Sequence, residues 1–257
     1  MFGSIIRRWR RSLDDVHSFA LFVGYPRSGH TVLGAVLNAH PDAVISHELH
    51  PLRNDWSRTR LFHAVLDRDD WWKRLGWQWE GWDYLIPGQW QGRYRTLRVL
   101  GDKSGGRTSR YVREHPAALT ELTNRLGSVR LRMIHHVRNP FDTIATMHRK
   151  GQPGVVTLDD AIARYPEHCE GVRIALDSAD VLTLDHETLT ADPHATIREL
   201  CEFVGLAPHA DHIDAAARIV HPSARRSRDL VEWTPEQTER VLAIMDRYPF
   251  LVQYQPA

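Results

Sequence analysis

The chain alternates short apolar runs with longer segments of helical periodicity. Five runs, mostly without polar alternation, predict buried strands at residues 19–23, 43–46, 97–100, 131–137 and 181–184. Between and after them, apolar residues recur at helical spacing and predict helices at 31–39, 58–66, 117–126, 140–149, 158–175 and 194–204. This alternation predicts an α/β fold: a P-loop-like parallel sheet flanked by helices, with ligands bound at the carboxyl ends of the strands.

One segment departs from this pattern. Seven of the nine tryptophans fall between residues 56 and 90, and the stretch WEGWDYLIPGQWQGRY has neither helical nor strand periodicity. We interpret residues 55–95 as an insertion that caps the sheet, where a substrate could lie against aromatic faces, or where the tryptophans form a small aromatic core. No internal repeat, low-complexity tract or linker divides the chain, so residues 1–257 are expected to form a single domain.

Composition excludes several classes of protein. The formal net charge is +1, which gives no overall basic surface for nucleic acid. Cys169 and Cys201 lie in no CxxC or Cys/His cluster, so both are expected to be free, buried thiols in a reducing, cytoplasmic compartment. No apolar run is long enough for a membrane span, and the basic stretch at 7–11 does not begin a typical signal peptide. That stretch is either a solvated helix face or a contact for a membrane surface.

The sequence GYPRSGHT at 24–31 follows the first predicted strand and leads into a helix. A glycine loop at a helix N-terminus binds phosphate or sulfate through backbone N–H groups. The ATP-binding pattern G-x-x-x-x-G-K-[ST] has a lysine where this chain has a histidine. That histidine either binds the anion or packs at the helix start. The candidate anion-binding residues of the loop are Arg27, Ser28, Gly29, His30 and Thr31.

A second anion site is predicted at the end of the fourth strand. The stretch IHHVRNP contains Arg138, and no apolar strand ends in an aspartate suited to magnesium. A guanidinium at a strand end suits a second phosphate, not a metal ion. Two anion sites on neighbouring strands imply a ligand with phosphates at both ends.

These two motifs resemble those of sulfotransferases. YPRSGHT is similar to the loop that binds the 5′-phosphosulfate, and VRNPFDTIATMHR is similar to the 3′-phosphate motif, R-x-P-x(5)-S. The family's serine falls on Thr146, eight residues after Arg138. Threonine keeps the hydroxyl of that serine. The resemblance implies 3′-phosphoadenosine 5′-phosphosulfate (PAPS) as donor, with no metal.

The resemblance extends over residues 19 to about 228. LNAHPDAVISHE is similar to tyrosylprotein sulfotransferases, whose catalytic glutamate falls on Glu48, and LRVLGDKSG places a family lysine on Lys103. DHETLTADPHATIRELCEFVGL puts His186 where a tyrosine often lies near the adenine. HPSARRSRD resembles a basic loop over the nucleotide, which makes Arg226 a further candidate.

The resemblance assigns catalysis to Glu48 as base and to Arg27 and Lys103 as cations around the transferred group. His47 and His50 compete for the role of base. If the second strand continues through residue 48, His47 and Glu48 face opposite sides, and only one can point at the donor.

The predicted function is transfer of a sulfuryl group from PAPS to a hydroxyl, in preference to an amine, by in-line transfer with a carboxylate base. The acceptor is a small molecule such as a hydroxylated metabolite, a sugar or a lipid, and the sequence does not choose among them or define an oligomeric state. One alternative is an ATP-dependent small-molecule kinase with a degenerate phosphate loop. Another is a non-catalytic nucleotide-binding protein.

Overall fold

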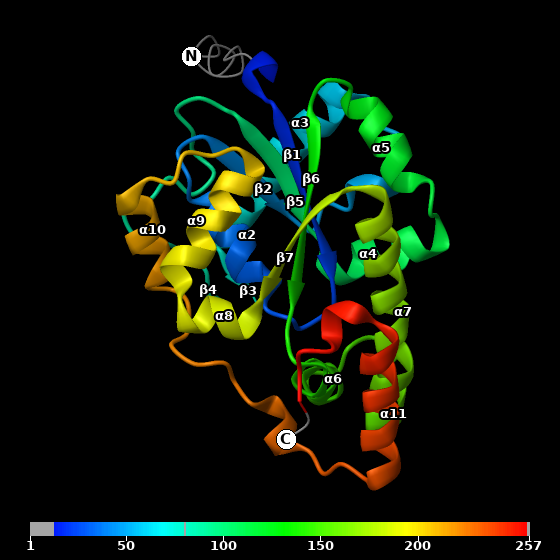
Figure 1. Cartoon of the computed structure of the whole chain (residues 1–257). Coiled ribbons are helices and arrows are strands. Elements are labelled where there is room, and N and C mark those ends of the chain that lie inside the picture. Colours follow the sequence, from blue (N-terminus) through cyan, green and yellow to red (C-terminus); the bar gives the residue numbers. More distant parts are fainter. Residues whose placement is uncertain (1–12, 80, 256–257) are drawn as a thin grey trace.

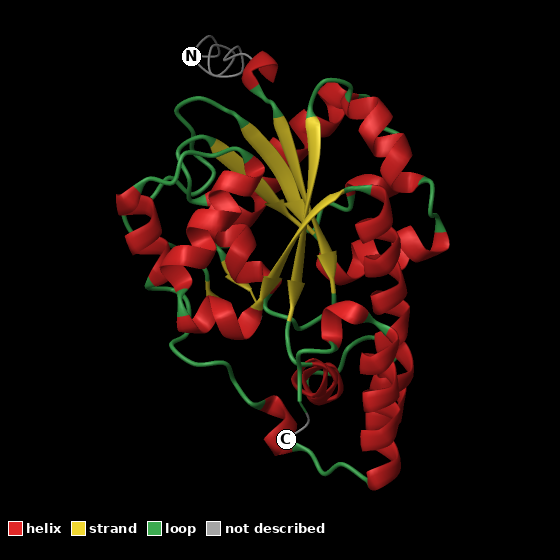
Figure 2. Cartoon of the chain, viewed as in Figure 1, coloured by secondary structure: helices red, strands yellow, loops and turns green. Residues whose placement is uncertain are grey.

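A five-stranded parallel sheet forms the centre of the computed structural model, which describes residues 13–79 and 81–255 (Figures 1 and 2). The strand order is β2 (Ala43–His47), β5 (Val99–Lys103), β1 (Ser18–Gly24), β6 (Arg130–Val137) and β7 (Asp180–Asp185). All five predicted strands are confirmed. The third begins two residues later than predicted, so Lys103 is its last residue and does not follow it. The basic stretch at 7–11 lies outside the described residues.

Each strand contributes side chains to two hydrophobic cores, because successive side chains of a strand point to opposite faces of the sheet. On β1, Phe19 and Leu21 pack in one core, whereas Ala20 and Phe22 pack in the other. The second core contains α2 (His30–Asn38), α8 (His186–Ala191), α9 (Pro193–Val204) and α10 (Ala210–Ala217). The first core contains α3 (Arg58–Arg74), α4 (Gly105–Glu114), α5 (Ala118–Leu126), α6 (Pro140–Arg149), α7 (Leu158–Ser178) and α11 (Pro235–Arg247).

Local signals in the sequence define several helix boundaries. The side chain of Asn139 accepts a hydrogen bond from the N–H of Phe141 and Pro140 opens α6, so this helix has the predicted bounds. Thr157 and Asp160 form a capping box that starts α7. α4, α8, α10 and α11 were not predicted. Of these, α4 begins with two glycines, which give no helical signal.

The tryptophan-rich segment divides into two parts. α3 continues to Arg74, eight residues past its predicted end, and packs beside β2, so Trp71 and Trp72 belong to a helix of the main fold. Residues 75–98 are irregular apart from a two-stranded hairpin, β3 (Gln78–Trp79) and β4 (Trp82–Asp83). Trp72 is fully buried, whereas Trp82 and Trp90 are exposed.

Both cysteines are free and buried, as predicted. Burial raises the pKa of the Cys169 thiol well above its ordinary value and that of Cys201 to about 12, so both stay protonated. Across the described part of the chain, no helix combines the length and the apolar character that a membrane crossing needs.

Candidate functional site

A cavity of about 1410 Å³ opens at the carboxyl ends of the strands. Its lining includes residues at or just past the ends of all five strands, which a parallel sheet brings to one edge. The volume exceeds the roughly 300–1,000 Å³ of a pocket for one small ligand, so two can fit side by side. The strand-end residues in the lining are Arg27, Glu48, Lys103, Arg138 and His186.

The loop after β1 has a phosphate-binding geometry. Arg27 and Gly29 have left-handed backbone, with φ of 67° and 94°, and α2 begins directly after Gly29. A Cβ at residue 29 would lie 3.4 Å from the rings of His136 and His186, so glycine suits this position both for its φ and for the close approach. The loop therefore presents the N-terminus of a nine-residue helix to the cavity.

His30 is packed into the base of this loop. Its Nδ1 lies 3.1 Å from the hydroxyl of Ser28, and a Cβ at Gly105 would come within 3.0 Å of its ring. Burial and the nearby charge of Lys103 lower the pKa of His30 to about 3, so the ring is neutral. His30 lines the cavity, and a neutral imidazole there could donate one hydrogen bond to an anion.

Lys103 and Glu48 meet beside the loop. Lys103 Nζ lies 3.3 Å from Glu48 Oε1 and 3.4 Å from His47 Nε2. The stem of Lys103 lies against Gly34 of α2, where a Cβ would come within 2.9 Å of it. Lys103 is 2% exposed and Glu48 23%, so the ammonium is buried while the carboxylate reaches the cavity.

The prediction that only one of His47 and Glu48 can face the donor assumed that the strand continues. β2 ends at His47, and Glu48 has a left-handed φ of 56°. The turn brings both side chains onto Lys103. Burial and the charge of Lys103 lower the pKa of His47 to about 2, and burial with Arg107 lowers that of His50 to about 4. Histidines that bind a proton this weakly are poor bases near neutral pH.

Asp102, which sequence reasoning did not select, holds the turn that carries Glu48. Oδ1 accepts hydrogen bonds from Leu49 N–H and the Ser46 hydroxyl, both at 2.8 Å. Oδ2 accepts from His50 N–H at 3.2 Å and from the Ser104 hydroxyl. Asp102 is fully buried, and burial raises its pKa despite these four donors. Its position directly before Lys103 in GDKSG was the available signal.

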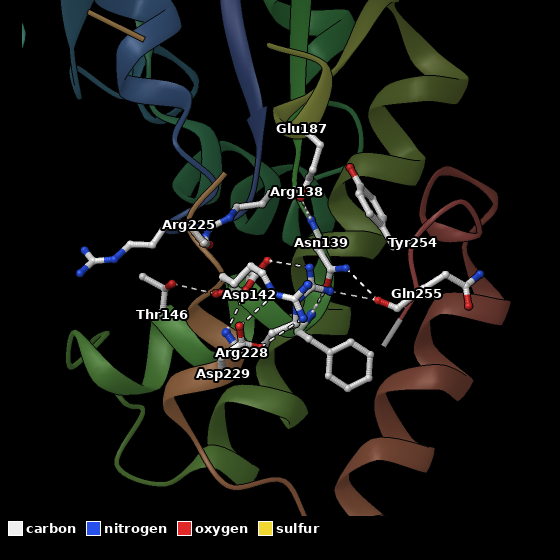
Figure 3. A network of polar contacts seen from close by, with 12 residues as sticks. Arg138, Asn139, Asp142, Thr146, Glu187, Arg225, Arg228, Asp229, Tyr254 and Gln255 are labelled. Atoms are coloured by element: carbon white, nitrogen blue, oxygen red, sulfur yellow. Dashed lines mark hydrogen bonds and ion pairs between the residues drawn. The ribbon is translucent and has the colours of Figure 1, made fainter. Parts of the chain in front are cut away.

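Arg138 lies in a buried polar network at the end of β6 (Figure 3). It donates a hydrogen bond to the carbonyl of Arg225, and its buried Nε has no hydrogen-bond partner among the described residues. Thr146 donates to the carbonyl of Asp142 at 2.7 Å. Asp142 also accepts from Arg228 N–H at 2.8 Å, which ties the 221–230 segment to α6.

The two remaining residues predicted to bind the nucleotide, His186 and Arg226, both line the cavity but differ in burial. His186 lies at the end of β7, with its ring 5.4 Å from that of His136. Burial lowers the pKa of His186 to about 4, so it is neutral. Arg226 lines the cavity, but it is exposed and pairs with Asp229 at 2.9 Å. Among residues 13–79 and 81–255, no group of three His, Cys, Asp or Glu side chains could hold a metal ion.

The fold and site together define a class: an α/β enzyme with a P-loop-like anion loop, a second cationic site and a lysine–carboxylate pair between them. The family model of the sulfotransferase domain matches residues 18–239. The chain therefore belongs to the sulfotransferase family, whose members use PAPS, and the predicted family is confirmed. No match is found among curated proteins.

Solved sulfotransferases have the same fold. The sulfotransferase domain of the Synechococcus PCC 7002 olefin synthase is 16% identical, with a TM-score of 0.58 over 97% of this chain and 99% of that one. Mouse sulfotransferase SULT7A1, complexed with PAP (3′-phosphoadenosine 5′-phosphate), is 15% identical, with a TM-score of 0.54 over 93% and 89%. STF9 from Mycobacterium avium is 13% identical, with a TM-score of 0.55 over 99% and 81%. At these identities the likeness establishes the fold.

Proposed function

We propose that the protein transfers the sulfuryl group of PAPS to a hydroxyl of a small acceptor, with Glu48 as the base. The observation that carries this proposal is the contact of 3.3 Å between Lys103 Nζ and Glu48 Oε1 beside the anion loop. A kinase would need a magnesium site and the loop lysine, and this chain has His30 at that position.

The donor fits the residues at both ends of the cavity. The loop around Gly29 and the start of α2 offer backbone N–H donors for the phosphosulfate. At the other end, the buried Nε of Arg138 lacks a hydrogen-bond partner within the described chain, as expected of a group that binds a ligand oxygen. Thr146 and Arg226 line the same end, and His186 lies between the two ends. PAP in the mouse relative agrees with this choice of donor.

The proposed transfer needs an activated sulfuryl group, a base and nearby cations. PAPS supplies the activated sulfuryl group. The oxygen of the acceptor hydroxyl forms a bond to sulfur while Glu48 takes the proton of that hydroxyl. The bond from sulfur to the 5′-phosphate oxygen breaks. Lys103 and Arg27 stabilise the charge that develops on the leaving phosphate and sulfuryl oxygens. Because the transfer needs mainly positioning and charge stabilisation, these groups suffice by analogy with phosphoryl transfer.

The acceptor would lie between Glu48 and the hairpin β3–β4. Trp79 and Trp82 of this hairpin line the cavity, and Trp79 also packs on His47 with ring centroids 4.5 Å apart. This gives the tryptophans both expected roles: Trp72 and Trp79 pack around His47, whereas the half-exposed Trp82 offers an aromatic face to an acceptor.

Calorimetry with PAP, compared with ATP and magnesium, tests the donor. We expect PAP to bind and ATP–Mg²⁺ to bind far more weakly; the reverse order would refute the proposal. An acceptor screen with PAPS, read by mass for a gain of one sulfuryl group, then tests the reaction. A protein that binds PAP and sulfates no acceptor would support a non-catalytic nucleotide-binding role instead.

A further inference from the structure

The cavity carries a large excess of positive charge. Eleven arginines and lysines line it, against the three carboxylates of Glu48, Asp83 and Glu167, although the whole chain has a net charge of only +1. The phosphates and sulfate of PAPS would neutralise roughly four of these cations. With the three carboxylates, this leaves about four cations, which would repel a cationic acceptor and attract an anionic one.

Four of the cations come from the segments that follow β2 and β5 and from α7. We call Arg53, Arg107, Arg110 and Arg164 the arginine wall. Arg107 and Arg110 lie one turn apart on α4, which starts directly after Lys103 and Ser104. Arg164 lies on α7, which packs along α4 (Figure 1). The wall therefore extends from the helix that follows Lys103 to the neighbouring α7.

Arg107 links the wall to Glu48. One of its Nη atoms lies 3.9 Å from Glu48 Oε2, and the other lies 2.5 Å from His50 Nε2. The guanidinium is about half exposed, so it can also bind a ligand. A group bound by Arg107 would lie next to a hydroxyl that faces Glu48.

The next arginine of α4, Arg110, has no ion-pair partner: within residues 13–79 and 81–255, no Asp or Glu oxygen lies within ion-pair distance of it. Arg164 makes no such pair either, although it lies within Coulombic reach of Asp160, one turn earlier on α7. Glu167, the acid nearest to them along α7, pairs with Arg113 at 3.3 Å. Burial, together with Arg110, Arg113 and Arg164, lowers the pKa of the nearby His168 to about 4, which agrees with a cationic field here.

We infer that the acceptor carries an anionic group (a carboxylate, phosphate or sulfate) beside the hydroxyl that is sulfated, and that Arg107 and Arg110 bind this group. The inference rests on the proposed function and names its substrate class. Guanidinium groups suit such anions because they can donate two parallel hydrogen bonds to a pair of oxygens. Trp79 and Trp82, across the cavity, would contact the body of the acceptor.

The test is a titration of protein saturated with PAP, so that the donor site is already filled. The probes are 4-hydroxyphenylacetate and 4-hydroxyphenylacetamide, which differ mainly in charge, and glycerol 3-phosphate with glycerol as a second pair. We expect the charged member of at least one pair to bind about tenfold more tightly or better. Equal binding within both pairs, or no binding of either anion, would overturn the inference.

Two variants connect the preference to the wall. Arg110→Gln is expected to reduce the preference to about twofold or less, whereas Arg110→Lys should retain a part of it because the charge remains. Arg173→Gln is the matched control, since Arg173 is exposed and pairs with Glu170 and Asp177 of its own helix. PAP binding by each variant shows that it is folded. A preference that is unchanged in Arg110→Gln would also overturn the inference.

The two proposals fail separately. Binding of the anionic probes without transfer to any acceptor would retain the anion site and refute the sulfotransferase reaction. Transfer to neutral acceptors, without a preference for the anionic members, would retain the reaction and refute the arginine wall as a binding site.

Discussion

The ammonium of Lys103 and the carboxylate of Glu48 lie 3.3 Å apart, although 54 residues separate them in the sequence. Lys103 ends β5, and Glu48 follows the adjacent, parallel β2. Their contact depends on a left-handed turn at Glu48 and on the buried Asp102 that holds it. The proposed base and the cation proposed to stabilise charge thus lie together at one edge of the sheet.

Glu48→Gln should lower kcat by about 10²- to 10⁴-fold, because the amide cannot take the acceptor proton. PAP affinity, measured by calorimetry, should stay within about twofold, since Lys103 and the loop remain. Glu167→Gln is the matched control: this carboxylate also lines the cavity but pairs with Arg113. A Glu48→Gln enzyme with kcat within about tenfold of wild type would assign the base elsewhere.

Arg138→Ala should weaken PAP binding by about ten- to a hundredfold, or roughly 1.5–3 kcal/mol, because a buried, charge-assisted contact to a phosphate is lost. Calorimetry measures this directly. Arg173→Ala, which removes an arginine on the surface, should leave the affinity unchanged. Unaltered PAP affinity in a folded Arg138→Ala protein would remove Arg138 from the donor site.

Asp102→Asn should lower kcat by about tenfold while PAP affinity is retained. The change replaces one acceptor oxygen with an NH₂ group that faces donors from the turn and from Ser46 or Ser104. The free energy of unfolding should fall by about 1–3 kcal/mol. If stability falls and kcat does not, Asp102 has a structural role only and does not position Glu48.

Gly29→Ala should weaken PAP binding by at least about tenfold, because a Cβ would be strained at φ 94° and would press on the rings of His136 and His186. Gly76→Ala is the control. Its φ is 67°, but a Cβ there meets nothing within 4 Å, so it adds the backbone strain without a change at the loop. Equal PAP affinity in the two variants would contradict a role for the loop.

Stability should fall as pH drops from 6.5 to 5.5. Seven buried or half-buried histidines have pKa values lowered by burial to between about 2 and about 4, whereas in the unfolded chain they protonate near 6.5. Their stabilisation is present above pH 6.5 and is lost below it, by about 1 kcal/mol per group between pH 6.5 and 5.5. The group comprises His30, His40, His47, His50, His135, His168 and His186.

Urea unfolding measures this effect. Asp69, Asp102 and Glu187 act in the opposite direction, because burial raises the pKa of each of them, to about 7 for Asp69, but they are three groups against seven. His135→Gln should reduce the loss of stability between pH 6.5 and 5.5 by about 1 kcal/mol. Arg173→Gln provides the control, because it removes no group that titrates in this window and should leave the slope unchanged. Stability that is flat or rises on acidification in this window would contradict the prediction.

Much of the fold could be predicted because its signals are local. Buried parallel strands are short apolar runs, and all five were found; the capped helix α6 was found with its bounds. α4 was missed because it starts with two glycines, whose value lies in close packing: a Cβ at Gly106 would come within 2.7 Å of Pro26. The predicted end of α3 was wrong, because the tryptophans of one dense block belong partly to this helix and partly to the hairpin that follows.

The sequence by itself determined which candidate site residues stand at the strand ends, because the motifs around Arg27, Glu48, Lys103 and Arg138 are contiguous stretches. Only the tertiary structure decided which groups touch. The left-handed turn at Glu48 depends on hydrogen bonds to Asp102, 54 residues away, and the arginine wall depends on the packing of α4 against α7. Contacts between distant segments depend on packing and burial in the folded chain, and a local sequence pattern does not predict them.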